Sequence, residues 1–561
     1  MFRTFLIIAA IVLSVMVPTL GVTAPPEYSQ LDSKPYDPAT EPDIDLFFSH
    51  WKESMPRHEH GTLVVRDILT PCTGDPLKPT ARGAVLTEIK RFSHATLAPG
   101  SSTVPSARKD EQEIFYIDAG RGTITSGGRT VELYEGVGII MPPNVEFTLS
   151  NTGGEQLGMY LIVEPIPEGF KPKKAMVVSD ENKNPIGSAN GHWCHIHKRL
   201  FAREDGLAVL YGMGPVWFDP MTMGQPHSHD EGIEEIWFSL KGASTILLGK
   251  ELRPFPPGTA YKIPPNAMTP HSTINSGEKA VKVFWFMKSG VHKMLPYSNL
   301  DPKPFDPATE PDIDMFFSHW KESMPRHSFG SLIERDIFTP CTGDPLKPAD
   351  RGAVLTDIKR FSHGTLEAGA STTPSKLENE QIIFYVDQGR GTVTAGGKTA
   401  ELYHGVGVLM PPGIEFTLTS TGSRSLTMYV IAEPIPAGFQ PKTEMQVRDT
   451  NASPIFTSSG HWVHISTRLF TKEDGLATLL GLGPVWFSPM TMGQPHSHPA
   501  GVEEIWFSLN GDPTILLGKQ LRPFPPGTAY KIPPNGTTPH STINTADEPV
   551  EVFWMMKVPG N

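Results

Sequence analysis

Two segments of nearly the same sequence carry the residues that could do chemistry in this chain. They read GQPHSHDEGIEEIWFSLKG from Gly224 and GQPHSHPAGVEEIWFSLNG from Gly493. Alternate side chains of a strand point to the same face, so His227 and His229 would lie side by side. An acidic pair follows, and His271 lies beyond a turn rich in Gly and Pro. Three imidazoles and one carboxylate suit a first-row divalent metal, and the repetition predicts two such sites.

The whole chain repeats itself at an offset of 269 residues. DPATEPDIDLFFSHWKESMPRH at Asp37 returns as DPATEPDIDMFFSHWKESMPRH at Asp306. Copies of this length are too long for solenoid repeats, so each is expected to be a multi-domain unit. Each copy divides again, because IFYIDAGRG and EGVGIIMPPN parallel IWFSLKG and PGTAYKIPPN further along. A strand ending in Gly, a hairpin and a Pro-Pro turn are therefore expected four times.

These repeats predict the domain boundaries. The expected segments are a signal peptide at 1–24, an N-terminal segment with a short helix at 25–84, β-units at 85–175 and 176–290, a linker at 291–304, the repeated N-terminal segment at 305–353, and β-units at 354–444 and 445–561. The stretch from Asp312 to Glu322 is the best candidate for a helix.

The composition narrows the class of protein and of partner. A chain of 561 residues can bury several cores, and 52 Gly with 56 Pro favour many short strands joined by tight turns. The net charge of −12 argues against nucleic acid or an anionic membrane as the main partner. The expected partner is a small-molecule substrate.

The first residues, MFRTFLIIAAIVLSVMVPTLGVTA, predict a secretory signal peptide, with cleavage after Gly21 or Ala24. The mature protein would be secreted or periplasmic and free of the membrane; the alternative is an uncleaved anchor. In an exported protein Cys72 and Cys341, equivalent in the repeat, could pair across a pseudo-two-fold axis, or they and Cys194 could stay free thiols.

The chain resembles the cupin superfamily through these motifs. His227 and His229 match its His-x-His, and Gly242 matches its closing Gly; placing six residues before that Gly gives Glu235, whereas placing four residues after His229 gives Glu234. The hairpin register favours Glu235 as the ligand. The resemblance implies an all-β fold of four cupin-like jelly-roll barrels, arranged as two duplicated bicupin halves. The expected metal ligands are His227, His229, Glu235 and His271 in one copy and His496, His498, Glu504 and His540 in the other.

The first barrel of each copy departs from the family pattern. Pro105, Ser106 and Ala107 stand where His-x-His is expected, and Phe147 and Phe416 replace the last histidine. Glu113 keeps the acidic position, but its counterpart is Ile382. These two barrels are expected to hold no metal and to be filled by core packing. A further histidine group, His192 and His195 with His461 and His464 in the second copy, has no acid at family spacing and is interpreted as surface or edge-strand residues.

What the resemblance implies about function is a metal-dependent enzyme, an oxidoreductase, lyase or isomerase acting on a small polar substrate. Mn(II) or Fe(II) is favoured, with Zn(II), Ni(II) or Cu(II) open, at two ions per chain. The open metal positions would take a carboxylate or a vicinal oxygen pair, and the predicted proton-transfer residues are Glu234, Glu503, Tyr261 and Tyr530. Gln225, Trp237 and Ser239 could also touch substrate. The alternative is a non-catalytic binding or storage protein.

The repeat also predicts quaternary organisation. Each copy is nearly full length and the linker is short, so each half keeps the surfaces of a would-be protomer. The two halves are expected to form an intramolecular pseudo-dimer, with further homo-oligomerisation left open.

Overall fold

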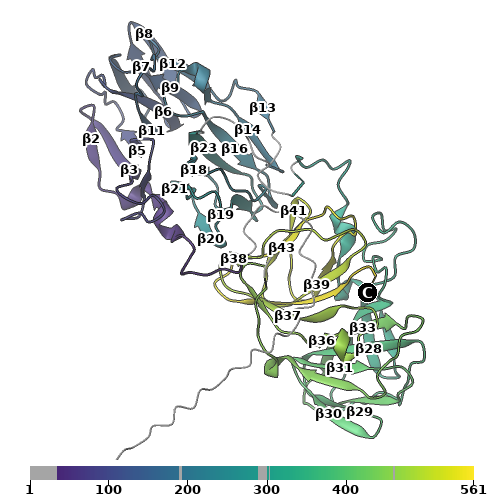
Figure 1. Cartoon of the computed structure of the whole chain (residues 1–561). Coiled ribbons are helices and arrows are strands. Elements are labelled where there is room, and N and C mark those ends of the chain that lie inside the picture. Colours follow the sequence, from purple (N-terminus) through teal and green to yellow (C-terminus); the bar gives the residue numbers. More distant parts are fainter. Residues whose placement is uncertain (1–33, 189–191, 289–299, 302, 459–460, 561) are drawn as a thin grey trace, which may run out of the picture.

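The computed structural model describes residues 34–188, 192–288, 300–301, 303–458 and 461–560, and strands dominate throughout. The predicted signal peptide and most of the predicted linker lie outside these residues. Figure 1 shows the two copies of the repeat at opposite ends of the molecule, with the purple-to-teal half meeting the green-to-yellow half in the middle. The predicted all-β class is confirmed.

The first unit of the first half consists of a large, mainly antiparallel sheet and a small antiparallel sheet packed face to face. Its apolar interior includes Phe115, Ile124, Phe147 and Leu149, all essentially inaccessible to solvent. The large sheet has the order β12 (Val177–Asp180), β9 (Val137–Met141), β6 (Glu111–Ala119), β11 (Leu157–Pro165), β5 (Arg91–Leu97), β3 (Leu63–Pro71) and β2 (Arg57–Glu59), with β4 (Ala84–Leu86) beside β3. The small sheet has the order β10 (Phe147–Asn151), β7 (Gly122–Ser126) and β8 (Arg129–Leu133).

The second unit of the first half carries the histidines. Its large sheet has the order β1 (Phe48–His50), β21 (Thr259–Lys262), β18 (Glu234–Lys241), β23 (Val281–Lys288), β16 (Gly212–Phe218), β14 (His195–Lys198) and β13 (Ile186–Gly187), with β15 (Phe201–Ala202) beside β16. Facing it are β17 (Thr222–Met223), β22 (His271–Asn275), β19 (Ser244–Leu248) and β20 (Glu251–Phe255). The histidines therefore lie where these two layers come together.

The second half repeats this arrangement. Its first unit has the order β25 (Pro325–Ser328), β26 (Leu332–Phe338), β27 (Arg360–Leu366), β33 (Leu426–Pro434), β28 (Glu380–Gln388), β31 (Val406–Met410) and β34 (Gln446–Asp449), faced by β30 (Lys398–Leu402), β29 (Gly391–Ala395) and β32 (Phe416–Ser420). Its second unit has β24 (Phe317–His319), β42 (Thr528–Lys531), β39 (Glu503–Asn510), β44 (Val550–Lys557), β37 (Gly481–Phe487) and β35 (His464–Ser466), with β36 (Phe470–Thr471) beside β37. The facing strands are β38 (Thr491–Met492), β43 (His540–Asn544), β40 (Thr514–Leu517) and β41 (Gln520–Pro523).

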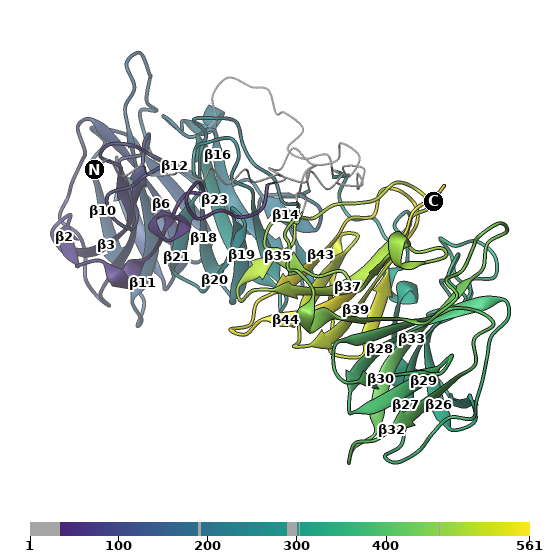
Figure 2. The same cartoon turned by 60° about the horizontal axis from the view of Figure 1, so that its bottom comes forward.

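The two halves share one closed barrel. Its strand order is β17-β22-β19-β20-β38-β43-β40-β41, so four strands come from each half, and Figure 2 shows this region between the two copies. The junctions pair Thr222 with Gln520 and Glu251 with Thr491. These are the same pair under the repeat, so the two halves meet about a pseudo-two-fold axis. Its core is apolar and includes Leu247, Leu252, Ile274, Leu516, Leu521 and Ile543.

The stretch predicted to be a helix, Asp312–Glu322, is instead a short strand between two single turns. η4 (Ile313–Phe316) and η5 (Trp320–Glu322) are 3₁₀ helices, and β24 between them pairs with β42. The first copy has η1 (Ile44–Phe47), β1 and η2 (Trp51–Glu53) in the same places. The apolar spacing resembles a helix, but pairing to a buried strand overrides the local preference.

Two further features bear on the predictions. Cys72, Cys194 and Cys341 are all free, so the disulfide alternative is not formed in this structure. Within the described residues, no helix has the length and apolar character needed to cross a bilayer.

Candidate metal centres

The first candidate centre joins the loop before β18 to the start of β22. The backbone of His271 donates to the carbonyl of His227 at 2.9 Å, so these two residues face each other across an isolated antiparallel bridge. The ring centroids of His227 and His271 are 4.3 Å apart, and each is 5.0 Å from that of His229. One nitrogen of each imidazole lies within 4.8 Å of the others. That spacing can hold a single ion.

A buried carboxylate completes this centre. Oε2 of Glu235 contacts Nε2 of His229 and lies 3.5 Å from Nε2 of His271. His227, Glu235 and His271 are at most 5% exposed, and the side chain of His229 is 8% exposed. The structure therefore brings together all four predicted ligands of the first copy.

The electrostatics favour neutral, metal-ready imidazoles. Burial, with the nearby His229, lowers the pKa of His227 to about 3, and burial also holds the pKa of His271 well below its ordinary value. Nδ1 of His227 lies 2.8 Å from the carbonyl oxygen of Gln225. An Nδ1–H that donates there leaves Nε2 with its lone pair for a cation, which is the usual outer support of a ligand histidine.

The second candidate centre repeats the first. The ring centroids of His496, His498 and His540 are 4.4–5.2 Å apart. Oε2 of Glu504 contacts His498 and lies 3.6 Å from Nε2 of His540, and Oε1 accepts from Nε1 of Trp554 at 2.5 Å. Burial would raise the pKa of Glu504, but the His498 and His540 imidazoles outweigh it and lower that pKa to about 2. The carboxylate is therefore ionised and can balance a cation.

The donor set fits a divalent metal. Both ring nitrogens of His271 are buried and lack a hydrogen-bond partner among the described residues, and the same holds for Nδ1 of His540. Buried polar atoms are normally satisfied, so these rings indicate a missing partner, and the unprotonated nitrogen of each neutral imidazole has a lone pair to give to a cation. Three imidazoles and one carboxylate suit Mn(II), Fe(II), Ni(II), Cu(II) or Zn(II), and they leave positions open on a six-coordinate ion.

Glu234 and Glu503, predicted to move protons, lie away from the histidines. Oε2 of Glu234 accepts from the backbone and hydroxyl of Thr87, both at 2.6 Å, and Oε1 accepts from the backbone of Ile89 at 3.1 Å. Lys262 Nζ lies 3.1 Å from the same carboxylate. Because successive residues of a strand face opposite sides, Glu235 enters the centre and Glu234 fastens a loop. Glu503 does the same for Thr356, Asp357 and Ile358.

Two aromatic side chains predicted near the substrate do lie by the centre. Trp237 shares the face of Glu235 on β18 and pairs across strands with Tyr261. The ring of Trp237 is 6.4 Å from that of His271, and its buried Nε1–H has no hydrogen-bond partner among the described residues; Trp506 repeats both features. Burial and the charge of Glu235 raise the pKa of Tyr261 well above its ordinary value, so its hydroxyl stays protonated, and Tyr530 behaves alike.

The other predicted contacts have different roles. Ser239 is fully buried and its hydroxyl lies 3.5 Å from the carbonyl of Gly242, within the hairpin. The amide Nε2 of Gln225 donates to the carbonyl of Leu300, which belongs to the second half, at 3.1 Å.

The ligand-poor units are filled by side chains. Phe147 and Phe416 are each 1% exposed and lie in the cores of their units. Glu113 is equally buried, but Nε2 of His60 lies 3.0 Å away and Nε of Arg108 donates to it at 3.1 Å. Arg108 also contacts Glu59. Glu59, His60 and Glu113 lie close enough to hold an ion, yet a guanidinium already neutralises their carboxylates.

The second histidine group was predicted at the surface or on an edge strand; His464 does lie on the edge strand β35, but the prediction of a surface position is wrong. His195 is 6% exposed, and its ring stacks on that of His192 at 4.2 Å. The ring of His192 meets that of His227, a metal-ligand candidate, edge-on at 5.3 Å. His461 and His464 repeat this arrangement at 4.3 Å, with His496 at 5.3 Å. The spacing of the family motif does not predict this group. The sequence signal that could have indicated it is its repetition in both copies.

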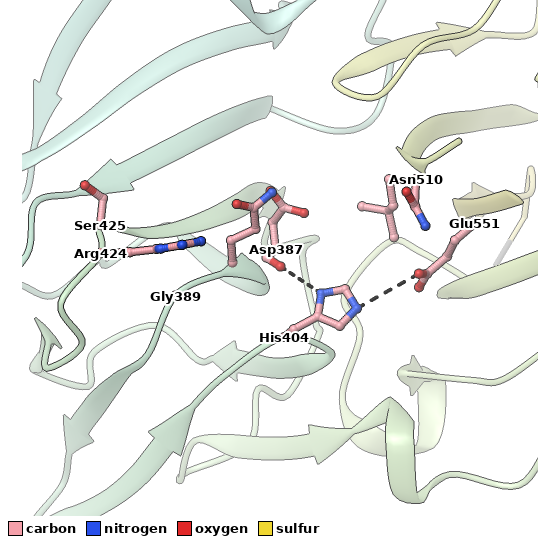
Figure 3. Close-up of a pocket in the computed structure, with 9 residues that line it drawn as sticks. Asp387, Gly389, His404, Arg424, Ser425, Asn510 and Glu551 are labelled. Carbon is pink, nitrogen blue, oxygen red and sulfur yellow. Dashed lines mark hydrogen bonds and ion pairs between the residues drawn. The ribbon is translucent and has the colours of Figure 1, made fainter. Parts of the chain in front are cut away.

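A separate cleft of about 430 Å³ lies between the two units of the second half (Figure 3). It is lined by Asp387, Gln388, Gly389, His404, Arg424, Ser425, Leu509, Asn510 and Glu551. His404 Nδ1 lies 2.7 Å from the carbonyl oxygen of Asp387, and Nε2 lies 4.0 Å from Glu551. In the first half Lys282 takes the place of Glu551 and pairs with Glu181 at 2.5 Å. The same position therefore carries a cationic residue in the first half and an acidic residue in the second. In both halves it pairs with a residue of the neighbouring unit.

A family model described as "Cupin domain" matches residues 93–163, 216–287 and 485–556, and the last two ranges contain the candidate ligands. Among solved structures, a putative glyoxylate-induced protein from Pseudomonas aeruginosa is 15% identical, with a TM-score of 0.36 over 48% of this chain and 98% of that one. A 7S globulin from Momordica charantia is 12% identical, with a TM-score of 0.35 over 44% and 84%. A variant of oxalate decarboxylase from Bacillus subtilis is 12% identical, with a TM-score of 0.33 over 43% and 77%. No curated protein matches the chain.

Proposed function

We propose that this chain, a multi-domain cupin protein, is an exported enzyme that holds one divalent metal ion at His227, His229, His271 and Glu235 and a second at the equivalent residues of the second copy. Its substrate is a small polar molecule with a carboxylate or a vicinal pair of oxygens. The reaction belongs to the oxidoreductases, lyases or isomerases. The observation that supports this proposal is a cluster of three imidazoles and one carboxylate beside a buried indole N–H, present in both copies.

Mn(II) and Fe(II) are the favoured ions, because mixed imidazole and carboxylate sites with open positions suit them. A bound ion would act as a Lewis acid that polarises the coordinated oxygen.

The residues of the chain define what else the site offers. The Trp237 indole N–H is a donor without acceptor capacity, and the protonated Tyr261 hydroxyl lies on the same face of the unit. Such groups favour an oxygen-rich anion over a cation. Buried walls around the centre exclude bulk water, which strengthens each of these interactions. Tyr261 and Tyr530 remain the candidates for holding or moving a proton, whereas Glu234 and Glu503 are engaged elsewhere.

The test begins with metal content. Protein purified after export should contain close to two ions by elemental analysis, and the double variant His229→Ala with His498→Ala should lose nearly all of them. The matched control is His60→Phe, which installs the residue that the second copy carries at position 329 and should leave the content unchanged. A protein that binds two ions but turns over none of a panel of small carboxylates and diols would support the non-catalytic binding role instead.

A further inference from the structure

A tight loop beside each metal centre has a strained backbone. Trp193 has φ of 41° and Trp462 has φ of 43°, the left-handed region that bulky residues rarely adopt. Both indoles are nonetheless buried, at 2% and 1% exposure, in the apolar core shared by the two halves. Such strain persists only where the surroundings fix the conformation.

The surroundings that fix each loop come from the opposite half of the chain. The carbonyl of Trp193 accepts from the backbone of Phe305 at 3.2 Å, and its indole Nε1 donates to the carbonyl of Asp301 at 2.8 Å. The thiol of Cys194 donates to the carbonyl of Lys519 at 3.0 Å. In return, the carbonyl of Trp462 accepts from the backbone of Tyr36 at 3.0 Å. Tyr36 and Phe305 are equivalent under the repeat, so the exchange is reciprocal.

Each loop also touches the centre of its own half. His192 precedes Trp193, and its ring meets the ring of His227 edge-on; His461 does the same to His496. The two copies keep His192 and His195 as His461 and His464, although Cys194 and His197 between and beside them become Val463 and Ser466. The retained residues are those whose rings line up toward the metal ligand.

A second connection runs through Gln225. Its side chain donates to the carbonyl of Leu300 in the second half, and its own carbonyl faces Nδ1 of His227. The segment containing Leu300, Asp301 and Phe305 therefore contacts two supports of the first centre, the loop of His192 and the residue that orients His227.

We infer that each metal centre is supported across the pseudo-two-fold axis: the N-terminal arm of one half positions His192 or His461 against the metal-ligand histidine of the other. His192 and His461 are positioning residues, and retention of the ion in one half depends on the arm of the other. This inference rests on the proposed metal centres.

The experiment isolates one centre at a time and uses Co(II) alone as the probe. In the His498→Ala background only the first centre can load. Adding Phe305→Pro removes the cross-half donor to Trp193, whereas Tyr36→Pro is its matched control in the same half as the loaded centre. The rate at which a chelator extracts Co(II) should rise about tenfold with Phe305→Pro, the scale typical of outer-shell supports, and stay unchanged with Tyr36→Pro. In the His229→Ala background the two substitutions should exchange effects.

A second variant set leaves the arm intact. His192→Ala in the His498→Ala background should speed extraction while the Co(II) stoichiometry is kept, and His192→Phe should restore slow release if ring packing is the support. His197→Ser installs the residue of the second copy and serves as the neutral control. Equal effects of Phe305→Pro and Tyr36→Pro on one centre, or no effect of His192→Ala, would overturn the inference. Failure of the unsubstituted protein to bind Co(II) would instead overturn the proposed function on which it rests.

Discussion

Glu234 and Glu235 are neighbours in β18, and their carboxylates serve opposite faces of one sheet. Glu235 contacts the histidines of the metal centre, whereas Glu234 binds the backbone of Thr87 and Ile89 together with Lys262. One strand position therefore separates a candidate metal ligand from a structural anchor, and the second copy repeats the division at Glu503 and Glu504.

The two carboxylates should respond differently to the same substitution. Glu235→Gln with Glu504→Gln should lower metal content, because each centre loses its only anionic ligand. Glu234→Gln with Glu503→Gln should keep the metal but lower the thermal midpoint, because it leaves a fully buried lysine without its charge partner; breaking such a pair costs about 3–5 kcal/mol. Elemental analysis and thermal unfolding of both double variants measure this. Loss of metal from the second pair would contradict the assignment.

The indole N–H groups of Trp237 and Trp506 should matter for ligand binding. Trp237→Phe with Trp506→Phe keeps an aromatic ring in each site and removes the donor. If the donor meets a charged oxygen, its loss costs about 2 kcal/mol, or roughly thirtyfold in affinity or turnover. Metal content should stay the same. Calorimetric titration of the metal-loaded protein with small dicarboxylates checks the affinity, and equal affinities of the variant and the parent would remove these residues from the site.

The candidate metal ligands could be located from the sequence through the family motif. The predicted strand alternation is wrong for His227 and His229, which lie in the loop before β18, whereas Glu235 and His271 do lie on strands. Sequence reasoning also recognised the filled units, since Phe147 in place of a histidine indicates packing. The choice between Glu234 and Glu235 depended on the register of one strand. The spacing to the hairpin residue Gly242 indicated that register and favoured Glu235.

Other features depend on contacts between segments distant in the sequence. His192 has no family spacing, and the neighbouring Trp193 accepts a hydrogen bond from Phe305 of the second half, the contact from which we infer support of His192 against His227. The segment Asp312–Glu322 has helical spacing, but β24 pairs with β42. The barrel shared by the halves needs the junction pairs Thr222–Gln520 and Glu251–Thr491, which no local pattern specifies.

The polar cluster in the first unit should be replaceable as a set. His60, Arg108 and Glu113 correspond to Phe329, Leu377 and Ile382, so the second copy shows the same fold without them. Glu113→Ile alone should destabilise the protein, because Arg108 and His60 lose their shared partner. The triple variant His60→Phe, Arg108→Leu, Glu113→Ile should recover most of that loss, since removing interacting ionic groups together is often neutral and Glu59 keeps Arg57 and Arg91 as partners. Thermal midpoints of the single and triple variants decide this, and metal content should not change in either.

His94 and His363 should make stability depend on pH. Burial, with the nearby His50 or His319, lowers the pKa of each from 6.5 to about 4. The unfolded chain takes up these protons near pH 6.5 and the folded chain only near pH 4, so acidification over this window favours unfolding. The contribution is fully present above pH 6.5 and is lost as the pH falls to 4, at about 3 kcal/mol per histidine.

His94→Phe and His363→Phe provide the comparison for that pH dependence. His94 stacks on Trp51 at 4.7 Å and His363 on Trp320 at 4.5 Å, so a phenyl ring keeps the packing and removes the proton site. The double variant should lose less stability than the parent between pH 6.5 and 4. Parallel curves of thermal midpoint against pH for the two proteins would contradict the role of these histidines.

An isolated half should rebuild the shared barrel with a second copy of itself. A chain from about Leu31 to Ser289 would expose the edges of β17 and β20, which in the full protein pair with β41 and β38. Because the junction pairs are equivalent under the repeat, Thr222 of one copy can pair with Glu251 of the other. Tyr36 can likewise donate to Trp193 of its partner, as it donates to Trp462 in the full chain. Apolar strand edges left open favour association.

The expected product is therefore a two-fold dimer with two metal ions, measurable by light scattering and elemental analysis. Leu252→Asp places a charge in the apolar core of the shared barrel and should shift the half toward monomers, whereas Val104→Asp, at an exposed position far from that core, should not. Dimerisation should also slow metal release, because the arm of each copy would then support the loop of the other. A half that stays monomeric, folds and keeps its metal as firmly as the full chain would show that neither the shared barrel nor the exchanged arms are needed.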